Sequence, residues 1–319
     1  MKAVIYTRYG SPDVLQLQSV QKPIPGDNEV RVKIRAAAAN PLDWHFMRAA
    51  PFIIRFISGL LKPRHQILGA DIAGQVEAVG ANVKQFKVGD EVYGEILRGG
   101  FAEYVCVTED KLVLKPTNLS FEQAAAVPVA GLTALQCLRD QGQLQPGQRV
   151  LINGASGGVG IFAVQLAKVF GAIVTGVCST QNVDRVRSIG ADQVIDYTRE
   201  DFTQTGQLYD LIFDNVGNRS IADIQRILAP NGTYLLNAYA PTLMLQLMLR
   251  AGKSKTGGQT MRNTDMTKSN QSDLEFLKAL LEAGKVVSVI DKVYPLSEVA
   301  DAIRHLEEGH ARGKVVITV

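Results

Sequence analysis

A glycine-rich turn between a predicted strand and a predicted helix carries the clearest chemistry in this sequence. The apolar run 149–153 leads into the turn, and residues 158–170 follow with the pattern of a helix. A helix N-terminus presents unpaired N–H groups and a positive dipole end, which together bind phosphate. The strict G-x-G-x-x-G pattern is incomplete because Ala155 replaces its first glycine, so a plain structural turn is the alternative. The residues expected to contact a dinucleotide diphosphate are Ser156, Gly157, Gly158, Val159 and Gly160.

The end of the next predicted strand, 172–178, decides which nicotinamide nucleotide fits. NAD-binding enzymes place an acidic residue about 20 positions after the glycine turn, on the ribose 2′-hydroxyl. No carboxylate stands at residues 178–182 here. Ser179 and Asn182 can donate hydrogen bonds to a 2′-phosphate, and Arg185 or Arg187 can add charge. The sequence therefore favours NADP, with helix capping and surface placement as the alternative roles of these residues.

Length and composition limit the remaining possibilities. With 319 residues, two domains are expected. The net charge of +3 is too small to indicate binding to nucleic acid or to an acidic membrane. No apolar run approaches the ~20 residues of a membrane span, and no signal-peptide pattern opens the chain. The three cysteines are far apart, which suggests neither a disulfide framework nor a metal knuckle, so a cytoplasmic location is expected.

The chain contains two regions that differ in the periodicity of their apolar residues, and these regions are expected to position the residues named above. The first ~120 residues alternate apolar and polar positions, as at 29–35, and 69–80 is expected to be a strand pair, which together suggest a β-rich, partly closed barrel. Ser120, followed by Gln123, predicts a helix start. Beyond it, strands and helices alternate, which predicts a doubly wound parallel sheet and an α/β fold. The expected strands are 149–153, 172–178, 193–195, 209–214 and 232–237, and the expected helices are 131–141, 158–170, 181–189 and 218–228.

The C-terminal part is expected to return to the first domain. The polar stretch 252–272 predicts a loop, followed by helices at 272–283 and 297–308 and strands at 286–290 and 314–319. The apolar run 240–249 is too short to span a membrane and predicts a core or interface helix. The expected domains are therefore 1–121 plus 265–319 and 122–264.

Several segments resemble the zinc-free medium-chain dehydrogenases/reductases, close to the quinone oxidoreductases of the zeta-crystallin group. They lie at 39–43, 68–74, 86–94, 100–104, 126–134 and 190–192, and the similarity covers essentially the whole chain. The resemblance implies a GroES-like domain beside a Rossmann domain, NADPH-dependent reduction of a small hydrophobic quinone or α,β-unsaturated carbonyl compound, and a homodimer.

The zinc ligands of the related alcohol dehydrogenases are missing from this sequence. Ala70 takes the place of the family's histidine, and four alanines at 36–39 stand where a cysteine would precede Asn40. Alanine cannot bind a metal, so a catalytic zinc would lack two of its three protein ligands. Without a Lewis acid, hydride transfer to a conjugated acceptor is the easier reaction. A zinc-free alcohol or aldehyde dehydrogenase and a low-turnover NADPH-binding scaffold or regulator are the alternatives.

The resemblance also implies roles for individual residues. The expected catalytic residues are Asn40, Asp43 and Trp44, which are expected in one loop. Asn40 would orient substrate oxygen or water near the nicotinamide. Asp43 could equally brace that loop, and His45 is either a general acid or an ordinary packed histidine. The further residues expected near the cofactor are Thr133, Tyr197, Asn215, Val216, Asn237, Ala238 and, as a weaker candidate, Lys314, for which a solvated lysine is the alternative.

A substrate pocket is expected between the two domains. The apolar run 50–57 is interpreted as a hydrophobic lid for a lipophilic substrate, with a packed helix as the alternative. Besides Trp44 and the 240–265 segment, the expected lining residues are Phe46, Phe52, Tyr93 and Ile96.

Overall fold

The computed structural model describes residues 1–52, 54–250, 258–309 and 311–319, and divides the chain into two compact units. Unit 1 comprises Met1–Leu132, Lys268–Gly284 and Ser288–Val319, and unit 2 comprises Thr133–Thr267 and Lys285–Val287. The first boundary thus follows Leu132 rather than residue 121, because α3 (Phe121–Ala125) packs on strands of unit 1. None of the helices in the described residues is long and apolar enough to cross a membrane.

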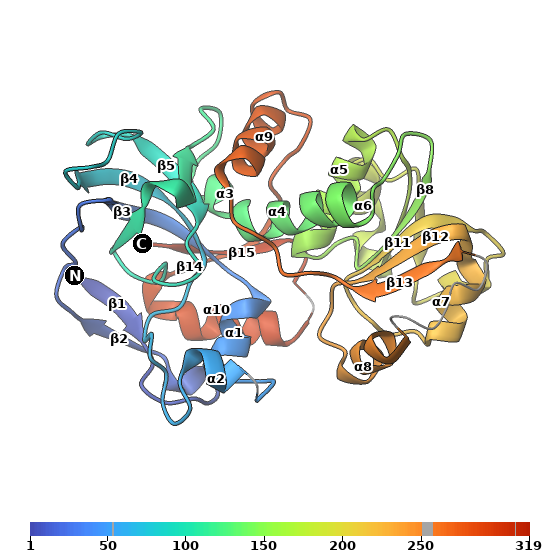
Figure 1. Cartoon of the computed structure of the whole chain (residues 1–319), viewed down its shortest axis with the longest axis horizontal. Helices are drawn as coiled ribbons and strands as arrows, with labels where there is room; N and C mark the ends of the chain where they lie inside the picture. Colours follow the sequence, from blue (N-terminus) through green and yellow to red (C-terminus); the bar gives the residue numbers. More distant parts are fainter. Residues whose placement is uncertain (53, 251–257, 310) are drawn as a thin grey trace. The chain divides into compact units, whose positions relative to one another are not determined.

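Unit 2 is built on a parallel sheet with helices as the crossovers (Figure 1). Its strands are β8 (Arg149–Asn153), β9 (Ile173–Cys178), β10 (Gln193–Asp196), β11 (Tyr209–Asp214), β12 (Leu228–Leu236) and β13 (Thr260–Asn263). Its helices are α5 (Gly158–Val169), α6 (Val183–Ser188), α7 (Ile221–Ile227) and α8 (Pro241–Arg250). A further helix, α4 (Pro128–Gln136), carries the chain from unit 1 into unit 2 and continues as a π-helical turn over Cys137–Gln141.

The strand order of unit 2 places a ligand site at one edge of its sheet. The order is β10-β9-β8-β11-β12-β13, with every pairing parallel. The chain therefore winds outward in one direction from β8 and in the other from β11, so the switch point lies between these two strands. Apolar residues of β8, β11, β12, α7 and α8 form one buried cluster. The predicted doubly wound fold is confirmed.

Unit 1 is β-rich and takes up both ends of the chain. Its strands are β1 (Lys2–Ile5), β2 (Gln16–Ser19), β3 (Glu29–Ala39), β4 (Asp71–Val79), β5 (Glu91–Glu95), β6 (Tyr104–Thr108), β7 (Leu112–Leu114), β14 (Ile290–Pro295) and β15 (Lys314–Thr318). Its other helices are α1 (Pro41–Arg48), α2 (Ile54–Ser58), α9 (Gln271–Glu282) and α10 (Val299–Glu307).

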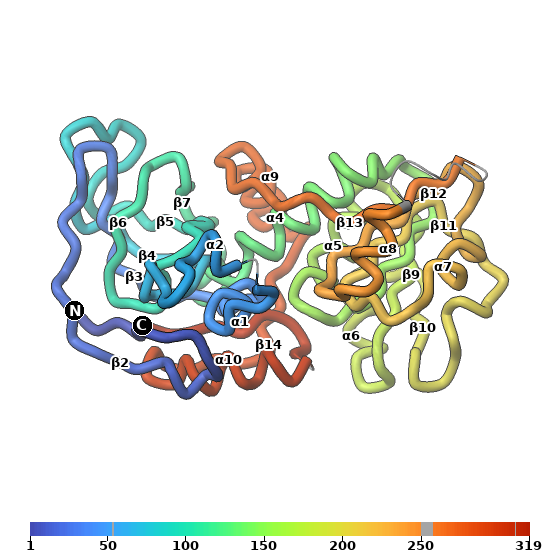
Figure 2. The backbone as a smooth tube through the Cα atoms, turned by 60° about the horizontal axis from the view of Figure 1, so that its bottom comes forward, coloured from blue at the N-terminus to red at the C-terminus, as the bar shows by residue number. Residues whose placement is uncertain are grey.

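Strand β3 is the centre of the larger sheet in unit 1. That sheet has the order β14-β15-β3-β4-β5-β7, and β6 also pairs with β3. The first half of β3 pairs with β6, and its last residues pair with β15, so the end of the chain returns to unit 1 as expected (Figure 2). The alternation at 29–35 is confirmed, because Val30, Val32 and Ile34 point into the core.

Three sequence expectations are wrong in detail. Residues 69–80 contain one strand, β4, rather than a strand pair. Residues 286–289 are not a strand, because the side chain of Gln165 pairs with the peptide of Val287 in place of a neighbouring strand. The expected loop at 252–272 contains strand β13, while its residues 252–257 lie outside the described part of the chain.

Candidate functional site

The glycine turn after β8 is shaped by two close backbone approaches. Gly154 has a φ of 77°, in the left-handed region that favours glycine. A Cβ on Gly160 would lie 2.1 Å from the carbonyl oxygen of Gly154, so the first turn of α5 packs directly on the end of β8. Both glycines are therefore required by the strand-to-helix connection itself.

The alanine in place of the first motif glycine is accommodated by a glycine on the neighbouring strand. Ala155 is fully buried, and its amide donates to the carbonyl of Val177 on β9. A Cβ on Gly176 of β9 would lie 3.1 Å from the Cβ of Ala155, and 2.6 Å from a methyl group of Val186. The missing side chain at Gly176 thus leaves room for the methyl group at Ala155.

Gly157 is less crowded than Gly154 and Gly160 on either side of it. It is the N-cap of α5, and a Cβ there would meet only the carbonyl oxygen of Gly154, at 3.4 Å. In the part of the chain that the structure describes, no side chain caps this helix end, and the first-turn amides of a helix have no acceptor within the helix. With Ser156, Gly158 and Val159 half-buried beside it, the turn fits a diphosphate group.

A buried carboxylate organises the ends of the neighbouring strands. Asp214, at the end of β11, accepts hydrogen bonds from the side chains of Asn153 (2.8 Å) and Tyr234 (2.9 Å). It also accepts from the amides of Val216 and Gly217, both at 2.9 Å. Sequence analysis missed Asp214, although a carboxylate that ends a predicted strand and precedes Asn-Val-Gly is a signal that could have found it.

The residues predicted at the ends of β11 and β12 are linked to one another. The side-chain amide of Asn215 donates to the carbonyl of Asn153 at 3.2 Å, and that of Asn237 donates to Asn215 Oδ1 at 2.8 Å. Val216 is exposed and Ala238 is half-buried. Thr133 is buried on α4, with its hydroxyl 3.0 Å from that of Thr267. The strand-end residues therefore lie at the edge where the doubly wound sheet places its ligand.

The end of β9 carries the residues predicted for the 2′-phosphate. Ser179 is half-buried, and Asn182 is buried and donates to Ser179 Oγ at 3.0 Å. Asn182 is thus placed to position Ser179. Arg185 is half-buried on α6, and Tyr197 is exposed just after β10.

A carboxylate and an arginine that sequence analysis did not single out lie beside this group. Asp196 accepts from the hydroxyls of Thr180 (2.6 Å) and Thr198 (2.7 Å), and these hydrogen bonds hold the pKa of its carboxyl below the ordinary range. Arg199 Nε lies 3.4 Å from Asp196 Oδ2, and the side chain is 74% exposed. The Asp196 charge is therefore engaged by neighbours, and Arg199 adds an exposed positive charge.

In unit 1, the loop between β3 and α1 is held by a buried carboxyl group. Asp43 accepts a hydrogen bond from the amide of Asn40 at 2.8 Å and another from the amide of Gly69 at 2.9 Å. Burial raises the pKa of Asp43 to about 7, against the opposing effect of these two hydrogen bonds. Asp43 therefore braces the start of α1, which is one of the two roles that the sequence left open.

Asn40 belongs to a buried network with an ion pair at its centre. Lys314 lies 3.1 Å from Asp71 Oδ2 and also donates to Asn40 Oδ1. The Asn40 amide donates to Asp71 Oδ2 at 3.0 Å and to the carbonyl of Ala38 at 3.2 Å, while Val129 donates to Asp71 Oδ1 at 2.8 Å. All these side chains are buried, so Lys314 is not the solvated terminal lysine that the sequence allowed.

A further carboxyl group stands opposite Asp71 on the next strand. Glu95 pairs with Asp71 in the register of β4 and β5, and its Oε2 is buried with no hydrogen-bond partner among the described residues. Burial, followed by the negative charge of Asp71, raises the pKa of Glu95 to about 7. Sequence analysis could not find Glu95, because its place depends on strand register.

The residues that the sequence placed in a loop after Asn40 belong to helix α1, which carries the aromatic residues Trp44, His45 and Phe46. Trp44 and His45 are half-buried with stacked rings, their centroids 3.7 Å apart. His45 Nδ1 lies 2.7 Å from the carbonyl oxygen of Ala50, and burial lowers the pKa of this histidine. A neutral His45 whose Nδ1 is bound to a carbonyl is a poor general acid at pH 7. Phe46 is half-buried, with the guanidinium of Arg98 4.6 Å from its ring centroid.

The remaining predicted substrate residues have different surroundings. Phe52 is exposed, in edge contact with Phe56, and Ile96 is half-buried against the core of unit 1. Tyr93 does not fit its prediction as a lining residue. It is fully buried and donates to the carbonyl of Leu274 at 2.9 Å, so it is a core residue.

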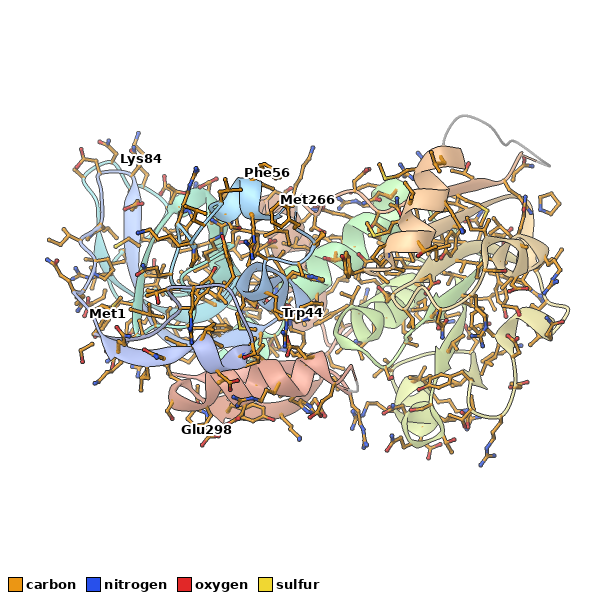
Figure 3. The ribbon with its side chains drawn as sticks, turned by 90° about the horizontal axis from the view of Figure 1, so that it is seen from below. Met1, Trp44, Phe56, Lys84, Met266 and Glu298 are labelled. Carbon is orange, nitrogen blue, oxygen red and sulfur yellow. The ribbon has the colours of Figure 1, made fainter. Side chains whose placement is uncertain are left out.

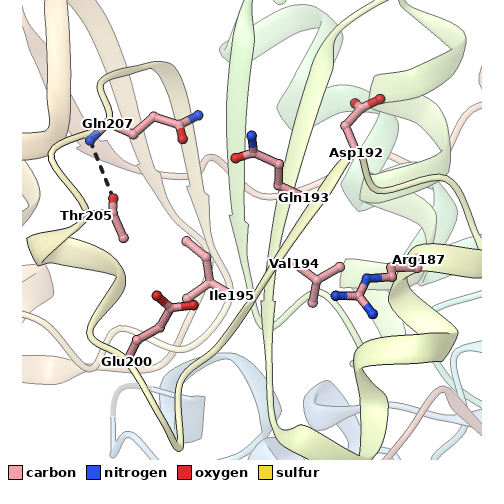
Figure 4. Close-up of a pocket in the computed structure, with 8 residues that line it drawn as sticks. All are labelled: Arg187, Asp192, Gln193, Val194, Ile195, Glu200, Thr205 and Gln207. Carbon is pink, nitrogen blue, oxygen red and sulfur yellow. Dashed lines mark hydrogen bonds between the residues drawn. The ribbon is translucent and has the colours of Figure 1, made fainter.

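The described residues do not fit a zinc ion. They contain no group of three or more His, Cys, Asp or Glu side chains that could hold a metal, and Ala70 stands beside Asp71. The Asp71 carboxylate is instead paired with an ammonium group. A separate cavity of about 430 Å³ lies at the outer edge of unit 2, against Gln193 and Ile195 of β10 and Glu200 (Figure 4). Of the residues predicted to bind cofactor, its lining contains Arg187 alone, which the sequence allowed as an alternative to Arg185.

Comparison with known proteins agrees with this architecture. The alcohol dehydrogenase GroES-like domain model matches residues 26–117, and a zinc-binding dehydrogenase model matches residues 189–317. The 2-methylene-furan-3-one reductase of Solanum lycopersicum is 39% identical over 331 residues, which cover 99% of this chain and 79% of the relative. The chain belongs to the medium-chain dehydrogenase/reductase family, in its quinone oxidoreductase group.

Solved members of the quinone oxidoreductase group share the whole fold. The quinone oxidoreductase from Coxiella burnetii superposes with a TM-score of 0.88 at 32% identity, covering 100% of this chain and 99% of the other. The Escherichia coli quinone oxidoreductase complexed with NADPH gives a TM-score of 0.85 at 25% identity, covering 100% of both chains. The protein is an oxidoreductase of this type.

Proposed function

We propose that this oxidoreductase uses NADPH to reduce a quinone or an α,β-unsaturated carbonyl compound, without zinc. The observation that carries the proposal is the glycine turn, in which a Cβ on Gly157 would meet only the carbonyl oxygen of Gly154, at 3.4 Å, beside a helix end with no side-chain cap among the described residues. NADPH supplies the hydride when it is bound, and the protein supplies its orientation and electrostatic surroundings.

The cofactor would be held along the carboxyl edge of the unit 2 sheet. We expect the amides of Gly158 and Val159 to bind the diphosphate, because the first-turn amides of α5 lack acceptors within the helix. Asn215 and Asn237 are linked by hydrogen bonds at the ends of β11 and β12, so each is fixed in place for contact with the nicotinamide end. Thr133 remains a further prediction for this end.

Preference for NADP rests on the end of β9. Ser179 is half-buried, and Tyr197 and Arg199 are exposed after β10, where they can donate to or pair with a 2′-phosphate. The negative charge of Asp196 would repel a 2′-phosphate, which argues against NADP. However, two threonine hydroxyls and Arg199 already engage its carboxylate. A solved relative is named as a complex with NADPH, which is in line with this proposal.

We infer that the hydride acceptor is a conjugated compound from the residues at the position where related dehydrogenases bind zinc. Without a metal ligand at Ala70 there is no Lewis acid to polarise an isolated carbonyl, and a conjugated acceptor takes hydride with less help. The name of the tomato relative, a 2-methylene-furan-3-one reductase, describes a conjugated enone substrate. In the Asn40, Asp71 and Lys314 network the polar groups bind one another, so we propose that it fixes the loop before α1.

The test is NADPH oxidation at 340 nm with 1,4-benzoquinone, 9,10-phenanthrenequinone and 2-alkenals, beside a panel of simple aldehydes. We expect turnover with the conjugated compounds, little with the simple aldehydes, and the same rates after treatment with a zinc chelator. An inert panel combined with tight NADPH binding would support the scaffold alternative and contradict the proposed function. A preference for NADH would contradict the proposed use of NADPH, and stoichiometric zinc in the purified protein would contradict the proposed zinc-free reaction.

The homodimer and the cytoplasmic location remain predictions from the resemblance and from the sequence. Light scattering coupled to size-exclusion chromatography tests the first, because a monomer and a dimer of a 34.6 kDa chain are well separated. Fractionation of the source cells tests the second.

A further inference from the structure

The chain contains a long basic and apolar segment that begins in the run 50–57, which the sequence suggested as a substrate lid, and extends beyond it. Between Asp43 and Asp71 there is no acidic residue, whereas Arg48, Arg55, Lys62 and Arg64 all fall within this interval. The whole chain carries a net charge of only +3, so its overall charge conceals this local excess. We call residues 52–64, without the undescribed residue 53, the basic apolar loop.

The basic apolar loop turns its large apolar side chains toward solvent. Phe56 is 67% exposed and Leu61 is 90% exposed, and three further large apolar residues of the loop are also exposed. These three are Phe52, Ile57 and Leu60. Soluble proteins rarely gather so many large apolar side chains on one exposed surface unless the surface binds a partner.

The backbone of the loop is fixed, so this exposure belongs to a defined surface. Tyr9 donates its hydroxyl hydrogen to the carbonyl of Gly59 at 2.6 Å. The amide of Arg64 donates to the carbonyl of Ser58 at 2.7 Å, which closes the turn after α2. The guanidinium of Arg55 lies 5.0 Å from the Tyr9 ring centroid and 5.2 Å from that of Phe52.

The positive charges of the loop are not neutralised within the described residues. Arg48, just before the loop, is paired with Glu307 at 2.8 Å. By contrast, Lys62 and Arg64 are exposed, and in the described part of the chain neither forms an ion pair with a carboxylate. Free cations beside exposed Phe and Leu side chains are typical of surfaces that lie in the headgroup region of a membrane.

We propose that the basic apolar loop docks unit 1 on the surface of an anionic lipid bilayer. Phe56, Leu61 and their neighbours enter the boundary between headgroups and acyl chains, while Lys62 and Arg64 pair with anionic headgroups. A second copy of the chain is a poorer occupant, because a two-fold interface through this loop would bring Lys62 and Arg64 close to their own copies. This inference stands on the loop alone and does not depend on the proposed function.

The test is sedimentation of the full-length protein with vesicles of phosphatidylcholine, with and without 30% phosphatidylglycerol, in 50 and 500 mM NaCl. We expect binding to the anionic vesicles at low salt, loss of most of it at high salt, and weak binding to neutral vesicles. Each basic residue near an anionic surface strengthens binding by about fivefold, so K62E/R64E should weaken it by at least about twentyfold. F56S/L61S should also weaken binding to the anionic vesicles, because apolar burial is lost.

Matched variants elsewhere in unit 1 distinguish docking by this loop from nonspecific effects of surface charge and exposed apolar side chains. K84E/K87E changes the charge by the same amount at exposed positions, and Figure 3 shows Lys84 well apart from Phe56. I24S removes an apolar side chain that is 79% exposed. Both controls should bind vesicles as the unaltered protein does, with all variants first shown to fold by circular dichroism and thermal melting.

Two outcomes would overturn the proposal. One is an unaltered protein that fails to sediment with anionic vesicles in 50 mM NaCl. The other is equal binding by K62E/R64E and K84E/K87E. If vesicles are not bound and K62E/R64E instead changes the association state in analytical ultracentrifugation, the loop is an interface between copies of the chain.

Discussion

Glu95 places a carboxyl group where its charged form is poorly accommodated. Its pKa is about 7, against an ordinary value of 4.5, so between these values the native state binds more protons than the unfolded state. Stability due to this group therefore falls as the pH rises from about 4.5 to about 7, and the loss is complete above that. We expect E95Q to raise the thermal midpoint at pH 8 by about 2 °C or more and to change it little at pH 4.5.

The matched control for E95Q is E275Q, on the exposed side of α9. Glu275 forms a surface ion pair with Lys278 at 3.7 Å, and such pairs contribute little to stability. The two variants are compared by thermal melting between pH 4.5 and 8. Equal pH dependence in E95Q and in the unaltered protein would show that Glu95 does not carry the effect.

The buried pair of Lys314 and Asp71 makes a second prediction at the residue scale. K314M leaves Asp71 buried without its cation, and breaking a buried ion pair in this way costs about 3–5 kcal/mol of unfolding free energy. Adding D71N removes the unpaired charge while keeping an acceptor for Val129, so the double variant should regain more than half of the loss.

Denaturant unfolding at two pH values checks how the loss of unfolding free energy in K314M depends on pH. Without the lysine, the pKa of Asp71 rises further, so at low pH the carboxyl group becomes neutral and the penalty shrinks. The loss in K314M should therefore be larger at pH 8 than at pH 5.5. A double variant no more stable than K314M would instead indicate that packing by the lysine chain, and not its charge, is what matters.

At the scale of elements, two variants of the glycine turn distinguish an effect on NADPH binding from an effect on folding. G157A adds a methyl group where only the Gly154 carbonyl oxygen is near, at 3.4 Å, so the fold should tolerate it while the approach of a diphosphate is blocked. G160A adds one 2.1 Å from that same oxygen and should destabilise unit 2. We expect G157A to keep its thermal midpoint and to bind NADPH at least about tenfold more weakly, a loss of about 1.4 kcal/mol.

Isothermal calorimetry and thermal melting together check this pair of variants. G160A should melt at a lower temperature than the unaltered protein even without ligand. Unchanged NADPH affinity in a folded G157A variant would mean that the turn is structural, which is the alternative that the sequence left open.

Sequence periodicity predicts elements whose partners lie close by in the chain. The strands at 149–153 and 209–214 are confirmed to the residue, because short apolar runs bounded by turns determine them locally. The strand at 286–290 failed because Gln165, far away in the chain, binds its backbone. Contacts of this kind depend on tertiary packing, which one sequence does not reveal.

In the candidate site, too, only the parts formed by residues close together in the sequence could be predicted. The glycine turn was visible because all its parts lie within one short segment. The pairing of Lys314 with Asp71 joins residues 243 positions apart, and the place of Glu95 depends on the register of two strands. Tyr93 was assigned to a pocket because aromatic residues suit either a pocket or a core, and only burial distinguishes the two.

For the whole molecule, connectivity predicts that the two units unfold together. The chain crosses between them four times, and the segment Lys285–Val287, which connects two unit 1 elements, is part of unit 2. Gln165 of α5 holds that segment through hydrogen bonds of 2.7 and 3.0 Å to the Val287 peptide. Loss of unit 2 therefore releases a connection within unit 1.

The single tryptophan makes this coupling measurable. Trp44 lies in unit 1, whereas the glycine turn that we propose to bind NADPH lies in unit 2. NADPH at 100 times its dissociation constant stabilises the state that binds it by about 2.7 kcal/mol. We expect the unfolding midpoint followed by Trp44 fluorescence to rise by about 5 °C or more, together with the midpoint followed by far-ultraviolet circular dichroism. At the same NADPH concentration, G157A should show a much smaller rise. A Trp44 midpoint that stays fixed while the circular dichroism midpoint moves would mean that unit 1 unfolds independently of unit 2.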